Sequence, residues 1–333
     1  MKAHSVLLAL FLLIGYTINI VAQVDRNLRF THLTNDNGLP TNTIYSLCQD
    51  FKGFIWIATA NGLCKYDGRS ISVYEVEPTK GERKKGGIIR HVFEDKRHRL
   101  WVITHKGVNL YNRNKDNFNF VSVDSLNNFS RVIYQDDKGK IYMGGSGAFI
   151  YNEQTSKFDP FYVNQDETIT AFITAITSDQ KGQMWFGRMY GGLICADVEN
   201  GKLTRYKHND HNINSLISNK VTSLFTDHHG RIWIGTEDKG ICYFDSSTNK
   251  FIRIEGFPQI CVRTFAEDAE GNIWIGSENG LYIYLSDENK FINYKQNYND
   301  KYSLNDNAIY TIFKDKENNM LVGTYFGGLN IFL

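Results

Sequence analysis

The chain has 333 residues, 42% of them hydrophobic, which is enough for a sizeable core in one large domain or two small ones. Its formal net charge of +1 shows no overall bias toward nucleic acid or an anionic membrane, so we expect no nucleic-acid contact. Aromatic residues make up 14%, and 28 glycines stand against only 4 prolines. This composition favours an all-β chain of short strands and tight turns.

The N-terminus has the pattern of an export signal. Lys2 precedes an apolar run from Val6 to Ile14, and a mixed segment then ends in Ala22. This pattern predicts a secretory signal peptide over residues 1–22 and therefore an exported protein. The alternative is an uncleaved N-terminal anchor in the inner membrane, but the run is short for a span of ~20 residues.

One spacing recurs along the rest of the chain. Seven times an Asp lies six residues before a large apolar residue, at intervals of 41 to 48 residues. The pairs are Asp50 with Trp56, Asp95 with Trp101, Asp136 with Tyr142, Asp179 with Trp185, Asp227 with Trp233, Asp268 with Trp274 and Asp315 with Leu321. All five tryptophans of the protein occupy this position. A strand-rich period of ~40–50 residues predicts the blades of a β-propeller.

Each unit has the same four predicted strands. In the first unit the strand TIYSLCQD ends at Asp50, a turn of the type Asp-x-x-Gly follows, and the second strand is FIWIA. Third strands resemble GLCKYD, and fourth strands resemble KFIRI. The Asp side chain can bond turn amides, and the Gly supplies a positive φ. Because the second strands are apolar without alternation, we expect neighbouring blades to cover both of their faces, with the tryptophans packed between blades.

A small residue follows the repeated apolar position by two. It is a glycine in five units, and we expect it to let a neighbouring blade approach: Gly144, Gly187, Gly235, Gly276 and Gly323. Ala58 and Ile103 depart from this pattern.

The two ends of the chain complement each other. The segment LRFTHLT resembles the fourth strands, and the closing segment GGLNIFL is a third strand with nothing after it. Their pairing would remove two open sheet edges. The sequence therefore predicts a seven-bladed β-propeller of four-stranded blades over residues 23–333, closed by the N-terminal strand.

Function is expected where the repeats differ, because the repeated Asp and Trp residues carry the fold. The fourth-to-first and second-to-third loops should share one face, around the central channel. Tyr and Phe rings stack on sugars, while Arg and carboxylates bond hydroxyl or carboxylate groups. The ligand-binding candidates are Arg83, His105, Arg188, Tyr190, Glu237, Asp238, Tyr325 and Phe326. The alternatives are packing of loop against loop and, around Arg83, a solvated basic surface or an anionic ligand.

No catalytic, metal or cofactor motif is present. The sequence contains no GxSxG, HExxH, phosphate-binding P-loop or Ca²⁺ loop, and no CxxC pair. His208 and His211 lie three apart but lack a third ligand. We therefore predict no catalytic residues, no metal and no cofactor.

The repeated motifs of this sequence resemble those of a known family. The stretch GLPTNTIYSLCQDFKGFIWIATANGLCKYDG, with the repeat D-x-x-G-x-I/L-W-I-G-T-x-x-G-L-x-x-Y, is similar to the two-component regulator propeller. These repeats build the periplasmic sensor region of hybrid two-component systems in Bacteroidetes. His98 and Asn318 replace the turn Gly, and Tyr142 and Leu321 replace Trp. The resemblance implies a periplasmic location and sensing of oligosaccharides from complex glycans.

The resemblance also implies partners. Family members continue with a second propeller, a β-sandwich, a membrane helix and kinase domains, none of which this sequence contains. Three hypotheses remain: a recognition module that binds an oligosaccharide or relays a signal to such domains, a scaffold or homodimerisation propeller without its own ligand, and a propeller lyase or glycosidase. The enzyme would need converging carboxylates or histidines, for which His105, Glu237 and Asp238 are the candidates.

Overall fold

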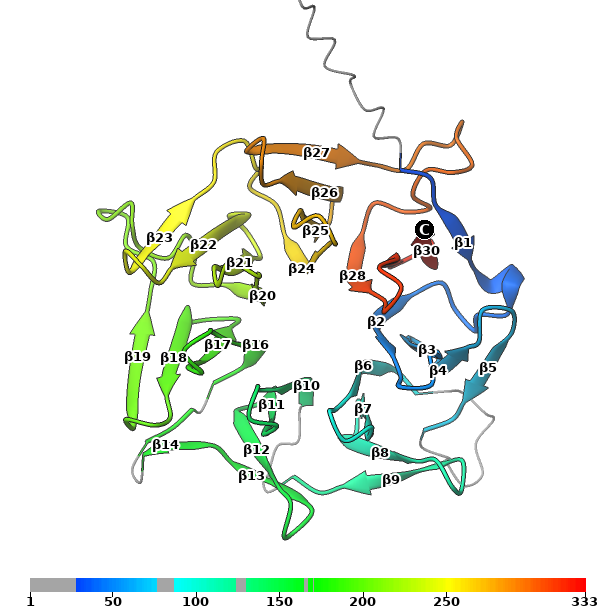
Figure 1. Ribbon diagram of the computed structural model, residues 1–333, viewed down its shortest axis with the longest axis horizontal. Helices are drawn as coiled ribbons and strands as arrows, with labels where there is room; N and C mark the ends of the chain where they lie inside the picture. The colour runs from blue at the N-terminus through cyan, green and yellow to red at the C-terminus, as the bar shows by residue number, and fades with distance from the viewer. Residues whose placement is uncertain (1–27, 77–86, 124–129, 165–166, 170) are drawn as a thin grey trace, which may run out of the picture.

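Seven four-stranded antiparallel sheets surround a central axis, and Figure 1 views the molecule along that axis. The computed structural model describes residues 28–76, 87–123, 130–164, 167–169 and 171–333, so the predicted signal peptide, residues 1–22, lies outside the described residues. In six of these sheets the strands neighbour each other in chain order, and the seventh combines the first strand of the chain with the last three. The predicted all-β, seven-bladed propeller is confirmed.

The four strands of a blade are ordered from the centre of the ring to its rim, with the first strand innermost. The first strands are β2 (Ile44–Gln49), β6 (Ile89–Glu94), β10 (Ser130–Gln135), β16 (Ile173–Ser178), β20 (Val221–Thr226), β24 (Val262–Glu267) and β28 (Ile309–Lys314). The second strands are β3 (Ile55–Thr59), β7 (Leu100–Thr104), β11 (Ile141–Gly145), β17 (Met184–Arg188), β21 (Ile232–Thr236), β25 (Ile273–Ser277) and β29 (Met320–Thr324).

The outer half of each blade is its second hairpin. The third strands are β4 (Gly62–Tyr66), β8 (Val108–Asn112), β12 (Ala148–Asn152), β18 (Leu193–Asp197), β22 (Ile241–Asp245), β26 (Gly280–Leu285) and β30 (Leu329–Phe332). The fourth strands are β5 (Ile71–Tyr74), β9 (Asn117–Val121), β13 (Lys157–Pro160), β19 (Lys202–Tyr206), β23 (Lys250–Arg253), β27 (Lys290–Tyr294) and β1 (Thr31–Leu33). A two-stranded sheet, β14 (Tyr162–Asn164) with β15 (Glu167–Thr168), lies between the third and fourth blades.

The repeated Asp and Trp belong to one hydrogen-bonded unit. In the fifth blade, Asp227 Oδ1 accepts a hydrogen bond from the Arg231 amide at 2.9 Å, and Oδ2 accepts from Trp233 Nε1 at 2.8 Å. The aspartate thus closes the turn and satisfies the one polar atom of a buried indole. Corresponding bonds of 2.9–3.1 Å run from Trp56 to Asp50, from Trp101 to Asp95, from Trp185 to Asp179 and from Trp274 to Asp268.

The tryptophans pack between neighbouring blades. All five indoles are buried, and each ring lies 4.8–5.9 Å from an aromatic ring in the third strand of the following blade. The contacts join Trp56 to Tyr111, Trp101 to Tyr151, Trp185 to Phe244, Trp233 to Tyr284 and Trp274 to Phe332. These side chains therefore belong to the core of the ring and are not available as a sugar platform.

The two units without Trp satisfy the aspartate differently. The Tyr142 hydroxyl donates to Asp136 at 3.3 Å, and Asn319 Nδ2 donates to Asp315 at 2.8 Å where Leu321 replaces Trp. His98 and Asn318 adopt the left-handed φ values, 62° and 68°, at the position of the turn glycine. Both residue types tolerate that region better than most.

Neighbouring blades contact closely at the predicted glycines. A Cβ added to Gly187 would lie 2.7 Å from Val221 Cγ1 in the first strand of the next blade. Gly144, Gly235, Gly276 and Gly323 meet the corresponding Ile or Val at 2.6–2.8 Å. All residues of the second strands are buried except Arg188, as expected for strands covered on both faces. At the junction of blades two and three the large and the small residue have changed places. Ile103 occupies the position that is glycine in other blades, and Ser130 occupies the position that is Ile or Val.

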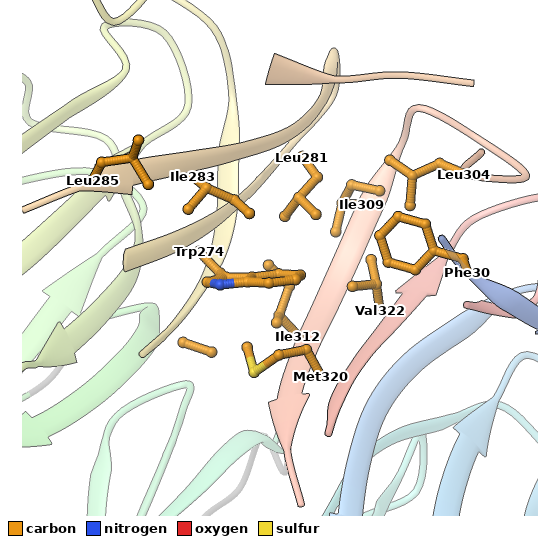
Figure 2. Close-up of a cluster of buried hydrophobic side chains, with 11 residues drawn as sticks. Phe30, Trp274, Leu281, Ile283, Leu285, Leu304, Ile309, Ile312, Met320 and Val322 are labelled. Carbon is orange, nitrogen blue, oxygen red and sulfur yellow. The ribbon is translucent and has the colours of Figure 1, made fainter. Parts of the chain in front are cut away.

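The N-terminal strand closes the ring, as predicted. β1 pairs antiparallel with β30, and Thr31 lies opposite Ile331. The preceding residue, Phe30, is 1% exposed and packs in the cluster between the sixth and seventh blades with Trp274, Leu304 and Val322, which Figure 2 shows. A side chain far from the C-terminus in sequence therefore completes the last blade's core.

Three further features complete the fold. The 3₁₀ turn η1 (Asn35–Asn37) carries a capping box formed by Thr34 and Asn37. No helix in the described part of the chain is long and apolar enough to span a membrane. The five cysteines are free, and all but Cys261 are buried.

Candidate ligand-binding channel

Every first strand carries a bulge at the same place. Ile44 lies opposite Thr59 and Ser46 lies opposite Ala58, so Tyr45 between them has no partner across the hairpin. The register shifts in the same way in all seven blades. A bulge locally disrupts the ladder and re-aims its side chain. The bulge residues are Tyr45, Arg90, Arg131, Thr174, Thr222, Arg263 and Tyr310.

These seven residues line one cavity in the central channel, with a volume of about 510 Å³. Tyr325 from a second-to-third loop lines it as well. Where the bulge residue is Thr, its hydroxyl serves the fold: Thr174 Oγ1 donates to the Val221 carbonyl of the next blade at 2.7 Å. Three blades instead have Arg and two have Tyr, so the channel is the place where the repeats diverge in chemistry.

The three arginines bring positive charge to the cavity. No Asp or Glu is among the described residues that line the cavity. Arg263 Nε donates to Glu278 Oε1 at 2.6 Å, and Glu278 belongs to the neighbouring second-to-third turn. Arg131 forms no ion pair with any carboxylate of the described residues. Burial, followed by the charges of Arg263 and Arg90, lowers the pKa of Arg131, although a guanidinium remains protonated in a protein.

Tyrosines form an aromatic wall on the side of the first and seventh blades. The rings of Tyr310 and Tyr325 stack with centroids 5.0 Å apart, and Tyr45 lies 5.8 Å from Tyr310. The guanidinium of Arg263 lies 4.2 Å from the centre of the Tyr310 ring. Burial raises the pKa of both Tyr45 and Tyr310, so their hydroxyls remain protonated donors at neutral pH. Such rings offer flat apolar faces with a polar tip.

His91 follows the Arg90 bulge and also lines the cavity. Its Nδ1 lies 3.3 Å from the Ser46 hydroxyl. Burial lowers the pKa of His91 to about 4, so the ring is neutral at pH 7. The charge of the cavity therefore comes from its arginines.

The two variable loop classes share one face, as expected. The amide of Gly62 in a second-to-third loop donates to the Gly87 carbonyl in a fourth-to-first loop, and Gly280 donates in the same way to Asn307. The channel cavity and these loops therefore belong to the same end of the molecule, because the bulges lie at the loop-side end of the first strands.

Tyr325 is the only predicted ligand candidate among the cavity's described lining residues. Phe326 is 71% exposed, packs edge-on against Tyr325 at 4.5 Å, and donates its amide to Asp306. Tyr190 is 73% exposed, and Arg188 is folded back on the Gly191 carbonyl of its own loop. A role of Arg188, Tyr190 and Phe326 in ligand binding stays a prediction.

The other candidates occupy further loops. Lys220 Nζ lies 3.1 Å from Glu237 and 3.8 Å from Asp238, so their charges are partly compensated. His105 is exposed in the loop after β7, and Arg83 lies outside the described residues. The structure therefore does not gather the seven described candidates into one cluster.

The sequence reasoning missed the arginines. All seven bulge residues lie five positions before the turn aspartate, so the alignment that revealed the repeat already contained the signal. The sequence predictions concentrated on loops, because loops usually carry function. A bulge places the variable side chain inside a regular strand instead.

No metal ligand set is assembled by the described residues. No group of three or more His, Cys, Asp or Glu side chains among them could hold an ion. His208 is engaged locally, with Nδ1 at 2.7 Å from the Leu216 carbonyl and Nε2 at 2.8 Å from Asp210.

A family model described as the two component regulator propeller matches residues 38–61, 215–238, 256–279 and 303–326. Each match spans a fourth-to-first loop, the first strand, the aspartate turn and the second strand of one blade. Four blades of the chain thus carry two-component regulator propeller repeats. No curated protein sequence matches it.

Two solved relatives of this regulator propeller come from B. thetaiotaomicron. The extracellular domain of BT3049, described as a hybrid two component system, has a TM-score of 0.78 at 24% identity over 92% of this chain and 42% of its own. That of BT4673, also described as a hybrid two component system, has a TM-score of 0.77 at 25% identity over 91% and 39%. The chain thus spans about two fifths of these domains.

Virginiamycin B lyase from Staphylococcus aureus has the same fold at greater sequence distance. Its TM-score is 0.68 at 15% identity, over 92% of this chain and 99% of its own. At that identity the likeness concerns the fold alone.

Proposed function

We propose that this regulator propeller is the ligand-recognition module of a glycan-responsive two-component sensor and binds an oligosaccharide at the channel face. The regulator propeller repeats and the similarity to the B. thetaiotaomicron extracellular domains support a sensor role outside the cytoplasm. Residues 1–22 would direct export to the periplasm. A bound ligand would act by shifting the balance of states sensed by partner domains, namely a second propeller, downstream sensor or kinase domains, or a second copy of the chain.

The observation that carries this proposal is the cavity lined by non-repeating side chains. Its volume of about 510 Å³ lies within the range of small-molecule sites. Tyr45, Tyr310 and Tyr325 supply ring faces for a pyranose, and Arg90, Arg131 and Arg263 supply hydrogen-bond donors for its oxygens.

The rim candidates would extend the site to further sugar units. Tyr190 and Phe326 expose their rings on the loops, and Glu237 and Asp238 present carboxylate oxygens for hydroxyl groups. His105, Arg188 and Arg83 complete the proposed rim.

Two other functions have weaker support. A scaffold or dimerisation propeller would use the exposed rings of Tyr190 and Phe326 for protein contacts, yet a polar cavity has no role in that function. A glycosidase would need a pair of converging carboxylates. The described channel lining offers none, and Glu237 and Asp238 lie beside Lys220.

The test is a thermal-shift screen of the full chain against neutral and acidic oligosaccharides. A ligand that binds only the native state stabilises it by about 2.7 kcal/mol at a concentration of 100 Kd, which raises the melting temperature. Tyr325→Ala should abolish the shift, while Tyr298→Ala, a 91% exposed tyrosine outside the cavity lining, should keep it. Equal shifts in both variants would place the ligand elsewhere, and no shift with any oligosaccharide would favour the scaffold.

A further inference from the structure

Three arginines of the cavity bear on the class of oligosaccharide that it could bind. Arg90, Arg131 and Arg263 come from three different blades, and each occupies the bulge of its first strand. The bulges aim all three side chains into the same channel. In the fourth and fifth blades Thr fills the bulge and bonds a strand carbonyl, so the fold itself does not require Arg there.

The charge of Arg131 has no paired carboxylate among the described residues. Glu278 compensates Arg263 from the rim, the described lining has no carboxylate, and His91 is neutral. Arg131 lies close enough to Arg90 and Arg263 for their charges to act on it. All three arginines are half-buried, and charges of one sign held partly out of water raise the free energy of the folded state unless an opposite charge lies beside them. An anionic group between these arginines would relieve that cost.

The shape of guanidinium groups narrows the anion. Their planar donors match the oxygens of a carboxylate or sulfate in a bidentate way. Tyr45 and Tyr310, whose hydroxyls are protonated, add two further donors and two ring faces beside the arginines. A charged group attached to a sugar ring fits this combination, because the oxygens meet the arginines while the ring meets the tyrosines.

We propose that the channel selects acidic oligosaccharides and seats one carboxylate or sulfate group between Arg90, Arg131 and Arg263. This inference rests on the proposed oligosaccharide recognition and names the class of sugar. Arg131 is the central determinant, since it lies under the influence of both other arginines and forms no ion pair with a described carboxylate.

The experiment is calorimetric titration of the full chain in a buffer free of phosphate and sulfate. The ligands are oligogalacturonates, their neutral methyl esters, sulfated chondroitin oligosaccharides, neutral malto-oligosaccharides and sodium sulfate. Arg131→Gln removes the central charge, and Arg69→Gln removes one exposed charge from the hairpin between β4 and β5, outside the cavity. Melting temperatures of both variants verify folding.

We expect at least one acidic oligosaccharide to bind and its neutral counterpart to bind at least tenfold more weakly. Arg131→Gln should weaken the acidic ligand by tenfold or more, as for loss of a charge-assisted hydrogen bond, while Arg69→Gln leaves it unchanged. Added NaCl should weaken binding of the acidic ligand.

Three results would overturn the inference, and each bears differently on the proposed function. Neutral sugars that bind equally well in wild type and Arg131→Gln would retain oligosaccharide recognition and remove the acid selectivity. Sulfate binding lost in Arg131→Gln without any oligosaccharide binding would make the channel a site for a free inorganic anion. No binding of any probe would reject both the inference and the proposed recognition.

Discussion

The two ends of the first strands behave in opposite ways. At one end, Asp227 and its six counterparts each accept hydrogen bonds in a turn, and five of them hold the indole of a tryptophan. Five residues earlier, the bulge position holds Arg, Tyr or Thr according to the blade. The fold therefore fixes the chemistry of one end and leaves the other end free, and the free end faces the channel.

The largest expected effect on stability comes from removing one of the turn aspartates. Asp227→Ala removes the acceptor of the Trp233 indole at 2.8 Å and of the Arg231 guanidinium at 2.6 Å. The substitution leaves a buried donor and an unpaired charge, so we expect the free energy of unfolding to fall by about 3–5 kcal/mol. Urea denaturation followed by tryptophan fluorescence measures the loss.

Asp136→Ala is the matched comparison in the third blade. There the side-chain donor is the Tyr142 hydroxyl at 3.3 Å, a longer bond, and no arginine of that turn bonds the carboxylate among the described residues. We expect less than half the loss seen with Asp227→Ala. Equal losses would mean that the turn amides, and not the indole and guanidinium, account for the stability.

A smaller effect is expected where blades meet. Gly187→Ala places a Cβ 2.7 Å from Val221 Cγ1 and should destabilise the protein by about 1–3 kcal/mol through overpacking. Val221→Ala alone should also destabilise, because Val221 is fully buried. The double variant should lose less than the sum of the two, since the second change makes room for the first. Additive losses would show that the close approach does not constrain this position.

The smallest expected effect is the pH dependence of stability that comes from His91, which lies at the channel end of its strand. The pKa of His91 is about 4 when folded against a usual 6.5, so below pH 6.5 the unfolded chain binds a proton that the folded protein does not. Stability attributable to His91 is therefore present above pH 6.5 and lost as the pH falls toward 4. Between pH 7 and pH 5.5 this amounts to about 1 kcal/mol.

His91→Gln is the variant that isolates this contribution. Urea denaturation at pH 7 and pH 5.5 should show a smaller loss of stability on acidification in the variant than in wild type. Identical pH dependence in both proteins would mean that the ring is accessible enough to protonate in the folded state.

The sequence predicted most of the fold for a specific physical reason. An aspartate that bonds both a turn amide and an indole imposes a fixed separation, so the pair of Asp50 and Trp56 recurs visibly along the chain. The match of LRFTHLT to a fourth strand predicted the closure by β1, and the burial of Phe30 explains its place in the last blade. Glycine recurs at five of the seven blade junctions because a Cβ there would collide with the next blade.

What only the tertiary structure decided is which variable residues face one another. Arg90, Arg131 and Arg263 are far apart in the sequence, and their common position five residues before the turn aspartate does not by itself show that their side chains share a cavity. The loop candidates Arg188, Tyr190, Glu237 and Asp238 had the expected residue types, yet the cavity does not include them. A strand alternates its side chains predictably, but a bulge and the closure of a sevenfold ring determine which of them converge.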